Sequence, residues 1–146
     1  KDLGMMAMSY GYVYVAQVAI GANQSQYLKA IREAEAYPGP SIIIAYSPCI
    51  NHGLKAGMGV TQKQQKFAAE SGYWPIYRFD PRRTDAFQWD STEPKIPFKD
   101  YILNEIRYKS LNILFPQKAE ALYKQAEDDA KNRFKVLKRM RVEEKK

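Results

Sequence analysis

Residues 12–20 read YVYVAQVAI, and this run of β-branched and aromatic side chains decides the fold. A strand with apolar residues at nearly every position is typical of one covered on both faces. Residues 41–46, SIIIAY, form a second apolar strand, and a helical pattern lies between the two. Asn23 is placed to cap that helix, and Pro38 follows its end. This order predicts a βαβ unit with parallel strands.

Further elements follow the same kind of pattern on either side of this unit. Residues 3–9 and 61–71 favour helices, and residues 73–79 favour a third strand. Pro75 within that stretch indicates an edge strand or an irregular one. Residues 81–97 contain three prolines and are expected to form a long connection. The predicted fold class is therefore α/β, with a parallel sheet.

The last third of the chain is predicted to be helical. Residues 98–115 are apolar around much of a helical circumference, and Pro116 ends that pattern. A long amphipathic helix then extends to about residue 140. We therefore expect an α/β unit at residues 1–80, a connecting loop at residues 81–97 and a helical extension of two helices at residues 98–146.

The positive charge of the chain is concentrated at one end. The net charge is +7, and residues 131–146 hold eight Lys or Arg and two Glu. Such a basic helix end is either a solvated tail or a surface for an acidic partner. A non-enzymatic binding module that uses this helix is therefore an alternative function. We do not expect nucleic-acid binding, because the aromatic residues do not alternate with basic ones as they do in base-stacking surfaces.

Targeting signals are not visible in the sequence. No apolar run approaches the roughly 18 residues that a membrane span requires, so we expect no membrane crossing. Residues 1–4, KDLG, offer neither an initiator Met nor the apolar core of a signal peptide. We expect this start to lie within a longer polypeptide.

Cys49 is the residue most open to chemistry, because it is the single cysteine and follows the predicted strand at residues 41–46. Ligands of parallel α/β sheets gather at such strand ends. The thiol can pack, act as a nucleophile or bind a metal, and its position alone leaves all three open. A zinc site requires four ligands, whereas Cys49 and His52 are two. An iron–sulfur cluster normally takes four thiolates, of which this chain offers one.

No other motif assigns a catalytic or cofactor-binding residue. The glycine-rich residues 53–59 match neither the Walker spacing nor the dinucleotide-binding pattern, so we interpret them as a turn. The acidic residues are scattered and form no evident acid/base pair.

Several long motifs nevertheless resemble one family, the pyruvate:ferredoxin (flavodoxin) oxidoreductases. The motifs are LGMMAMSYGYVYVA at residues 3–16, LKAIREAEAYPGP at 28–40, IAYSPCINHGL at 44–54, GYW at 72–74 and EIRY at 105–108, and shorter matches include YR at 77–78. The resemblance extends to about residue 140. It implies that residues 1–80 are the second half of a thiamine diphosphate-binding (PP-type) domain.

The resemblance also implies an activity and a role for the cysteine. The family oxidatively decarboxylates pyruvate to acetyl-CoA, using thiamine diphosphate, Mg²⁺ and coenzyme A. Its 4Fe–4S clusters pass single electrons to ferredoxin or flavodoxin. In the family, the cysteine that matches Cys49 is the fourth ligand of the cluster nearest the thiamine, and the other three cysteines lie far upstream. Asn51 and His52 are candidates to tune that cluster through hydrogen bonds.

Much of the family's machinery is missing from these residues. The GDG-to-Asn motif that holds magnesium and diphosphate, the coenzyme A region and the other three cluster cysteines are absent. No catalytic or thiamine-binding residue is therefore carried over, and we expect the isolated segment to be inactive. The family resemblance implies as partners the remainder of the parent, ferredoxin or flavodoxin, and the pyruvate and coenzyme A that the parent binds. It also implies that the parent is a homodimer in the cytoplasm, or in a hydrogenosome-like organelle in a eukaryote.

Overall fold

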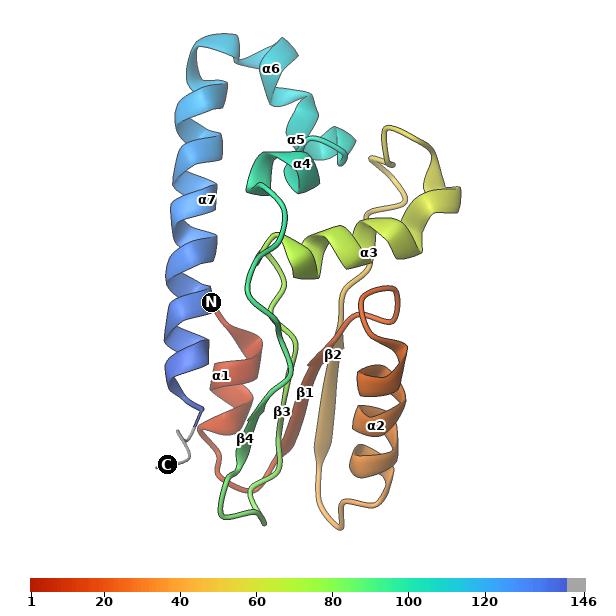
Figure 1. Ribbon diagram of the computed structural model, residues 1–146, viewed down its shortest axis with the longest axis vertical. Coiled ribbons are helices and arrows are strands. Elements are labelled where there is room, and N and C mark those ends of the chain that lie inside the picture. Colours follow the sequence, from red (N-terminus) through yellow and green to blue (C-terminus); the bar gives the residue numbers. More distant parts are fainter. Residues whose placement is uncertain (142–146) are drawn as a thin grey trace.

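The computed structural model describes residues 1–141, in which four strands form one mixed sheet of order β2-β1-β3-β4 (Figure 1). The strands are β1 (Tyr14–Val18), β2 (Ser41–Ala45), β3 (Tyr77–Phe79) and β4 (Phe87–Trp89). The helices are α1 (Leu3–Met8), α2 (Gln24–Glu35), the 3-10 turn η1 (Met58–Val60), α3 (Thr61–Glu70), α4 (Phe98–Ile102), α5 (Ile106–Lys109), α6 (Leu111–Leu114) and α7 (Pro116–Arg139). The α/β class is confirmed.

The βαβ unit is present as predicted. β1 pairs in parallel with β2, and the side chain of Asn23 accepts the backbone N–H of Gln26 at 2.9 Å to cap α2. Every residue of β1 is buried. One face of β1 packs with α2, and the other packs in a cluster with α1 and α7. The absence of polar alternation in residues 12–20 is explained by this double cover.

The rest of the sheet is antiparallel, so the prediction of a parallel sheet is wrong beyond the β1–β2 pair. β3 pairs antiparallel with β1 and with β4, which makes β3 an interior strand rather than an edge. β4 lies within residues 81–97, where a connecting loop was predicted. The turn at residues 80–86 joins β3 to β4, and a link this short permits only antiparallel pairing, because a parallel pair requires a crossover of about a dozen residues.

The helical extension also differs in detail. The single helix predicted over residues 98–115 is divided into α4, α5 and α6. Glu105 has an extended backbone, with φ −88° and ψ 120°, and pairs with Leu54 in an isolated antiparallel bridge. This pairing is incompatible with a continuous helix. α7 is the predicted long amphipathic helix, and residues 142–146 of the predicted extension lie outside the described residues.

β2 forms one edge of the sheet within residues 1–141. Ile42 and Ile44 pack partly against the core, whereas Ser41, Ile43 and Ala45 are exposed. The second apolar strand is therefore only partly covered by the described residues.

A buried ionic cluster joins α2, β3 and the segment after β4. Arg78 is 6% exposed and lies between two carboxylates, with 2.7 Å from Nη1 to Glu33 and 2.8 Å from Nε to Asp90. The Tyr14 hydroxyl donates to Glu33 at 2.9 Å. A buried guanidinium is stable only when carboxylates occupy its donors in this way.

Replacement of Arg78 with Ala is expected to destabilise the chain, because it leaves Glu33 and Asp90 without their shared cation. The expected loss is about 3–5 kcal/mol in the free energy of unfolding, measured by urea denaturation. Arg83→Ala is the matched control, because Arg83 pairs with Asp85 at the surface. An equal urea midpoint for the two variants would contradict the role given to Arg78.

Candidate functional site

Cys49 lies in a loop that begins where β2 ends, and we define residues 46–57 as the Cys49 loop. The loop lies beyond the carboxyl end of β2 and leads toward α3, as the sequence predicted (Figure 1). The Tyr46 N–H donates to the Val18 carbonyl at 3.0 Å, which extends the β1–β2 pairing by one residue. The Gly53 N–H then donates to the Cys49 carbonyl at 2.9 Å, and this bond closes a single turn.

That turn brings His52 against the thiol. Nδ1 of His52 lies 3.2 Å from Sγ of Cys49, and the cysteine is partly exposed. The hydrogen bond from the His52 side chain, with smaller contributions from the backbone of His52 and Asn51, lowers the pKa of Cys49 to about 7. A substantial fraction of the thiol is therefore thiolate near neutral pH, which is the form that attacks electrophiles and binds metals.

The far end of the Cys49 loop is fixed to the segment between α4 and α5. Leu54 is buried and bridges Glu105. The Lys55 N–H donates to the Asn104 carbonyl at 2.8 Å, and the Ile106 N–H donates to the Gly53 carbonyl at 3.2 Å. Gly53 has φ +77°, a left-handed conformation that glycine adopts without strain. Backbone hydrogen bonds therefore hold the far end of the loop to residues 104–106.

A buried cluster of hydroxyl groups holds the near end of the same loop. The Tyr46 hydroxyl donates to Oε1 of Glu105, and its oxygen lies 2.8 Å from the Tyr101 hydroxyl. Tyr101 is also 3.1 Å from the same carboxylate oxygen. The amide of Gln64 is a weaker neighbour of that oxygen at 3.5 Å. Glu105 is 5% exposed, so its carboxylate depends on these donors for the solvation that it lacks.

The electrostatics of the cluster keep its hydroxyl groups protonated. Burial raises the pKa of Tyr46 well above its usual range, and the hydrogen bond to Glu105 raises it further. Burial is also the main cause of the raised pKa of Tyr101. Both tyrosines therefore remain donors over the physiological pH range.

Sequence reasoning found Cys49, Asn51 and His52 but missed Tyr46 and Glu105 as members of the site. The structure brings His52 to the thiol, whereas both Asn51 and His52 have exposed side chains. A signal for Tyr46 was its position as the last residue of the predicted apolar strand. Glu105 was hidden because residues 98–115 were predicted to be one helix, in which its extended backbone and its bridge to the loop are not visible.

The metal-binding capacity of the described residues is limited. Within residues 1–141 there is no group of three or more His, Cys, Asp or Glu that could hold a metal ion. Cys49 can therefore serve a cluster only as one donor among ligands from elsewhere. Its partly exposed thiol and lowered pKa suit that role, because a ligand shared with other segments must be reachable and deprotonated.

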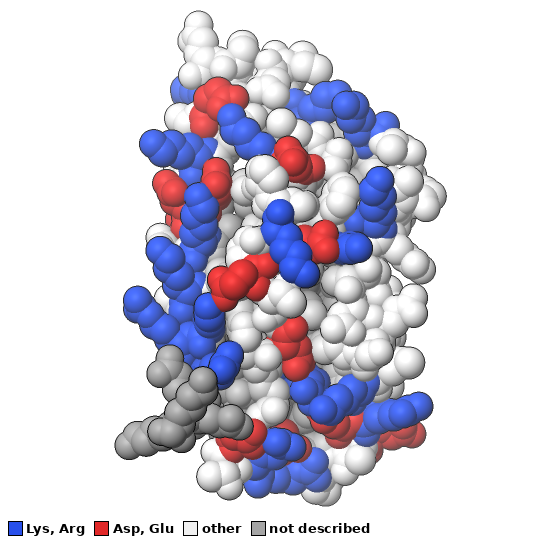
Figure 2. Space-filling view, viewed as in Figure 1, with Lys and Arg blue, Asp and Glu red and all other residues white. Residues whose placement is uncertain are grey.

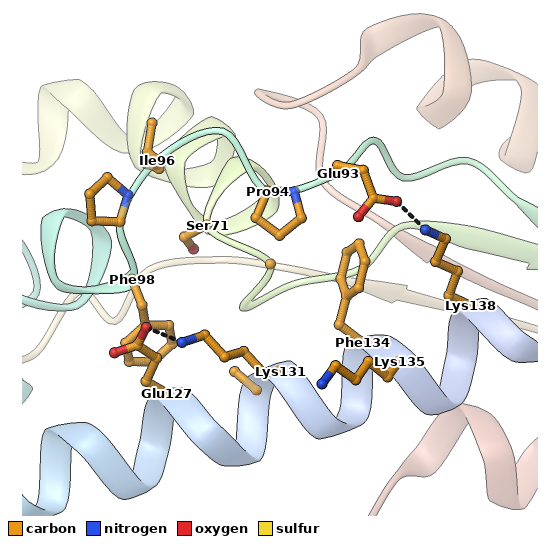
Figure 3. Close-up of a pocket in the computed structure, with 13 residues that line it drawn as sticks. Ser71, Glu93, Pro94, Ile96, Phe98, Glu127, Lys131, Phe134, Lys135 and Lys138 are labelled. Carbon is orange, nitrogen blue, oxygen red and sulfur yellow. Dashed lines mark hydrogen bonds and ion pairs between the residues drawn. The ribbon is translucent and has the colours of Figure 1, made fainter.

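A separate groove lies along α7 (Figure 3), and its lining residues include none from the Cys49 loop. Its volume is about 390 Å³, and apolar side chains including Phe98 and Phe134 line it. The acidic groups of the groove are engaged, since Glu127 pairs with Lys131 and Glu93 pairs with Lys138. Paired charges around an apolar floor provide no evident acid/base couple, so we do not place catalysis here.

The surface of α7 carries much of the positive charge visible on one face (Figure 2). Several of these cations already contact groups of this chain. Lys131 and Lys138 form the ion pairs of the groove, and Arg133 donates to the Tyr73 carbonyl. Within residues 1–141, no helix combines the length and the apolar composition needed to span a membrane.

Comparison with known proteins shows which proteins the chain resembles in sequence. No protein-family model matches it. It is 55% identical over 144 residues to the pyruvate-flavodoxin oxidoreductase of Enterobacter agglomerans and 53% identical to the pyruvate:ferredoxin oxidoreductase of Moorella thermoacetica. The chain is homologous to one segment of these oxidoreductases. The resemblance inferred from the motifs is therefore confirmed.

These matches cover the chain and the relatives very unequally. Each of the two alignments takes in 96% of this chain and 12% of the relative. The pyruvate-flavodoxin oxidoreductase of Klebsiella pneumoniae, at 54% identity, is matched over 99% of the chain and 13% of its own length. The homology thus describes one segment of an oxidoreductase.

The lowered pKa of Cys49 predicts a shift in the pH dependence of its reactivity. In the 146-residue chain, alkylation by iodoacetamide should rise through a midpoint at about pH 7, because only the thiolate reacts. His52→Ala removes the principal hydrogen bond and should move the midpoint upward, toward the ordinary value of 9.0. Asn51→Ala is the control, since Asn51 contributes through its backbone. An unchanged midpoint in His52→Ala would count against the contact.

Proposed function

We propose that this chain is a segment of an oxidoreductase that oxidatively decarboxylates pyruvate to acetyl-CoA and passes electrons to ferredoxin or flavodoxin. Within that enzyme, Cys49 is the fourth ligand of the 4Fe–4S cluster nearest the thiamine. The observation that carries this assignment is the partly exposed thiol at the carboxyl end of β2, with its pKa lowered to about 7 by His52. The homology of the whole segment to pyruvate oxidoreductases supports the choice of enzyme.

The chemistry of the site fits an iron ligand better than a packed thiol. Iron–sulfur clusters are held by thiolates, and the His52 contact favours that form before any metal binds. The cluster supplies single-electron transfer when it is bound. Cys49 would hold one iron from the end of β2, where its thiol is partly exposed. The other three thiolates come from residues outside this segment.

The remaining parts of the proposed enzyme are not assigned to residues of this chain. Thiamine diphosphate, Mg²⁺, coenzyme A and pyruvate are bound by the remainder of the parent. The α/β unit completes a PP-type thiamine diphosphate-binding domain with that remainder. The parent is a homodimer in the cytoplasm or in a hydrogenosome-like organelle.

The alternative function, a binding module that uses its basic helix, has less support. Such a module depends on cations that are free to meet a partner, and binding to nucleic acid would weaken steeply with salt. On α7, Lys131, Arg133 and Lys138 already contact groups of the chain itself. Weak and nonspecific binding is the expectation from the oxidoreductase proposal.

Cys49→Ala in the oxidoreductase that contains this chain should remove or alter one cluster and slow electron transfer. Electron paramagnetic resonance and iron content measure the loss directly. Ser47→Ala is a matched control in the same loop, because it removes a hydroxyl group and no thiol. Intact spectra for every cluster in Cys49→Ala would contradict the assignment of Cys49 as an iron ligand.

The 146-residue chain by itself should show no pyruvate-dependent reduction of an electron acceptor, because the motifs that hold magnesium and diphosphate are not in it. The measurement is reduction of a viologen dye with pyruvate, coenzyme A, thiamine diphosphate and Mg²⁺ present. The parent enzyme serves as the positive control. Turnover by the chain alone would overturn the proposal that it is a dependent segment.

A further inference from the structure

We propose that Glu105 is a positioning residue that sets the place of the Cys49 thiol by holding both ends of the Cys49 loop. This inference rests on the proposed function, in which Cys49 binds iron. Glu105 reaches the near end through its side chain, which accepts the Tyr46 hydroxyl. At the far end it lies opposite Leu54 in the antiparallel bridge, whose hydrogen bonds are made by its neighbours Asn104 and Ile106. Cys49 lies in the chain between these two contacts.

The near contact fixes the direction in which the chain leaves the sheet. Every polar group of Tyr46 is bonded: the N–H to Val18, the carbonyl to Gln65 at 3.2 Å and the hydroxyl to Glu105. Its ring also packs against Trp74, with 5.4 Å between ring centroids. Tyr46 is three residues before Cys49, so a rotation of its backbone would displace the thiol directly.

The far contact prevents the loop from swinging about that first anchor. The bridge between Leu54 and Glu105 is flanked by backbone bonds from Lys55 to Asn104 and from Ile106 to Gly53. Leu54 is 4% exposed, so apolar burial reinforces the bridge. With both ends held, the turn that carries Cys49 has little freedom to change its distance from a cluster.

The carboxylate is suited to this role because it is buried without a cation. Within residues 1–141, Glu105 forms no salt bridge, and its hydrogen-bond donors are hydroxyl and amide groups. A buried carboxylate that loses such donors pays a large desolvation cost, so the cluster resists partial opening. Metal ligands require this kind of supporting contact, because small displacements change metal affinity and potential.

The test compares Glu105→Ala, Glu105→Gln and Tyr46→Phe in the full-length oxidoreductase, with Glu120→Gln as a matched control at an exposed position of α7. The measurements are the midpoint potential and paramagnetic spectrum of the cluster that Cys49→Ala removes. Hydrogen exchange at Gly53 and Lys55 reports the loop itself. Glu105→Ala should shift the potential and spectrum of that cluster alone and speed exchange roughly 10- to 100-fold, because it removes the acceptor that the two buried hydroxyl groups share.

Glu105→Gln retains an acceptor for Tyr46 and should restore most of the potential, spectrum and exchange rate. A general loss of stability would instead affect the other clusters as well. If Glu105→Ala does not fold, Glu105→Gln and Tyr46→Phe carry the test with smaller shifts in the same direction. Unchanged potential, spectrum and loop exchange in all three variants overturn the positioning role. If Cys49→Ala itself leaves every cluster intact, the proposed function fails instead, so the two failures are distinguishable.

Discussion

The guanidinium of Arg78 is buried between the carboxylates of Glu33 and Asp90, and the mixed sheet depends on this arrangement. Its Nη1 donates to Glu33, which joins β3 to α2. Its Nε and Nη2 donate to Asp90, which joins β3 to the segment after β4. Because a buried cation without partners is far costlier than a surface one, these elements must assemble in one relative position. β1 lies next to β3 in the sheet and is covered on both sides, so its burial follows from the same assembly.

A second buried charge performs a different task at the carboxyl end of β2. Arg78 is neutralised by opposite charges, whereas Glu105 is surrounded by neutral donors from Tyr46, Tyr101 and Gln64. Neutral donors satisfy a carboxylate only in well-aligned geometry, so this cluster specifies position more than it adds stability. The fold therefore combines an ionic cluster that holds the sheet together with a hydroxyl cluster that holds the loop beyond it.

The sequence was sufficient wherever a single local pattern controlled the outcome. The uninterrupted apolar run predicted β1, Asn23 predicted the start of α2, and the helical stripe predicted α7. The direction of β3 and the existence of β4 depend on which strands meet in space. The three residues of β4 lie in a proline-containing stretch and carry too short a pattern to be recognised.

The residues of the candidate site likewise include some that local sequence predicted and some that it could not. Cys49 was identified from its place after an apolar strand and from the family motifs around it. The contact between Cys49 and His52 required the closed turn that ends at Gly53. The hydrogen bond between Glu105 and Tyr46 joins residues 59 positions apart in the sequence. The bridge between Glu105 and Leu54 interrupts the helix that the neighbouring residues favour. No local pattern encodes such a contact.

The exposed edge of β2 has a consequence for the behaviour of the chain in solution. Ser41, Ile43 and Ala45 present an uncharged row beside backbone groups that have no strand partner within residues 1–141. Natural edge strands usually carry lysine, proline or a bulge that blocks further pairing, and β2 has none of these. This edge of the separated chain is therefore a template on which a further strand can pair.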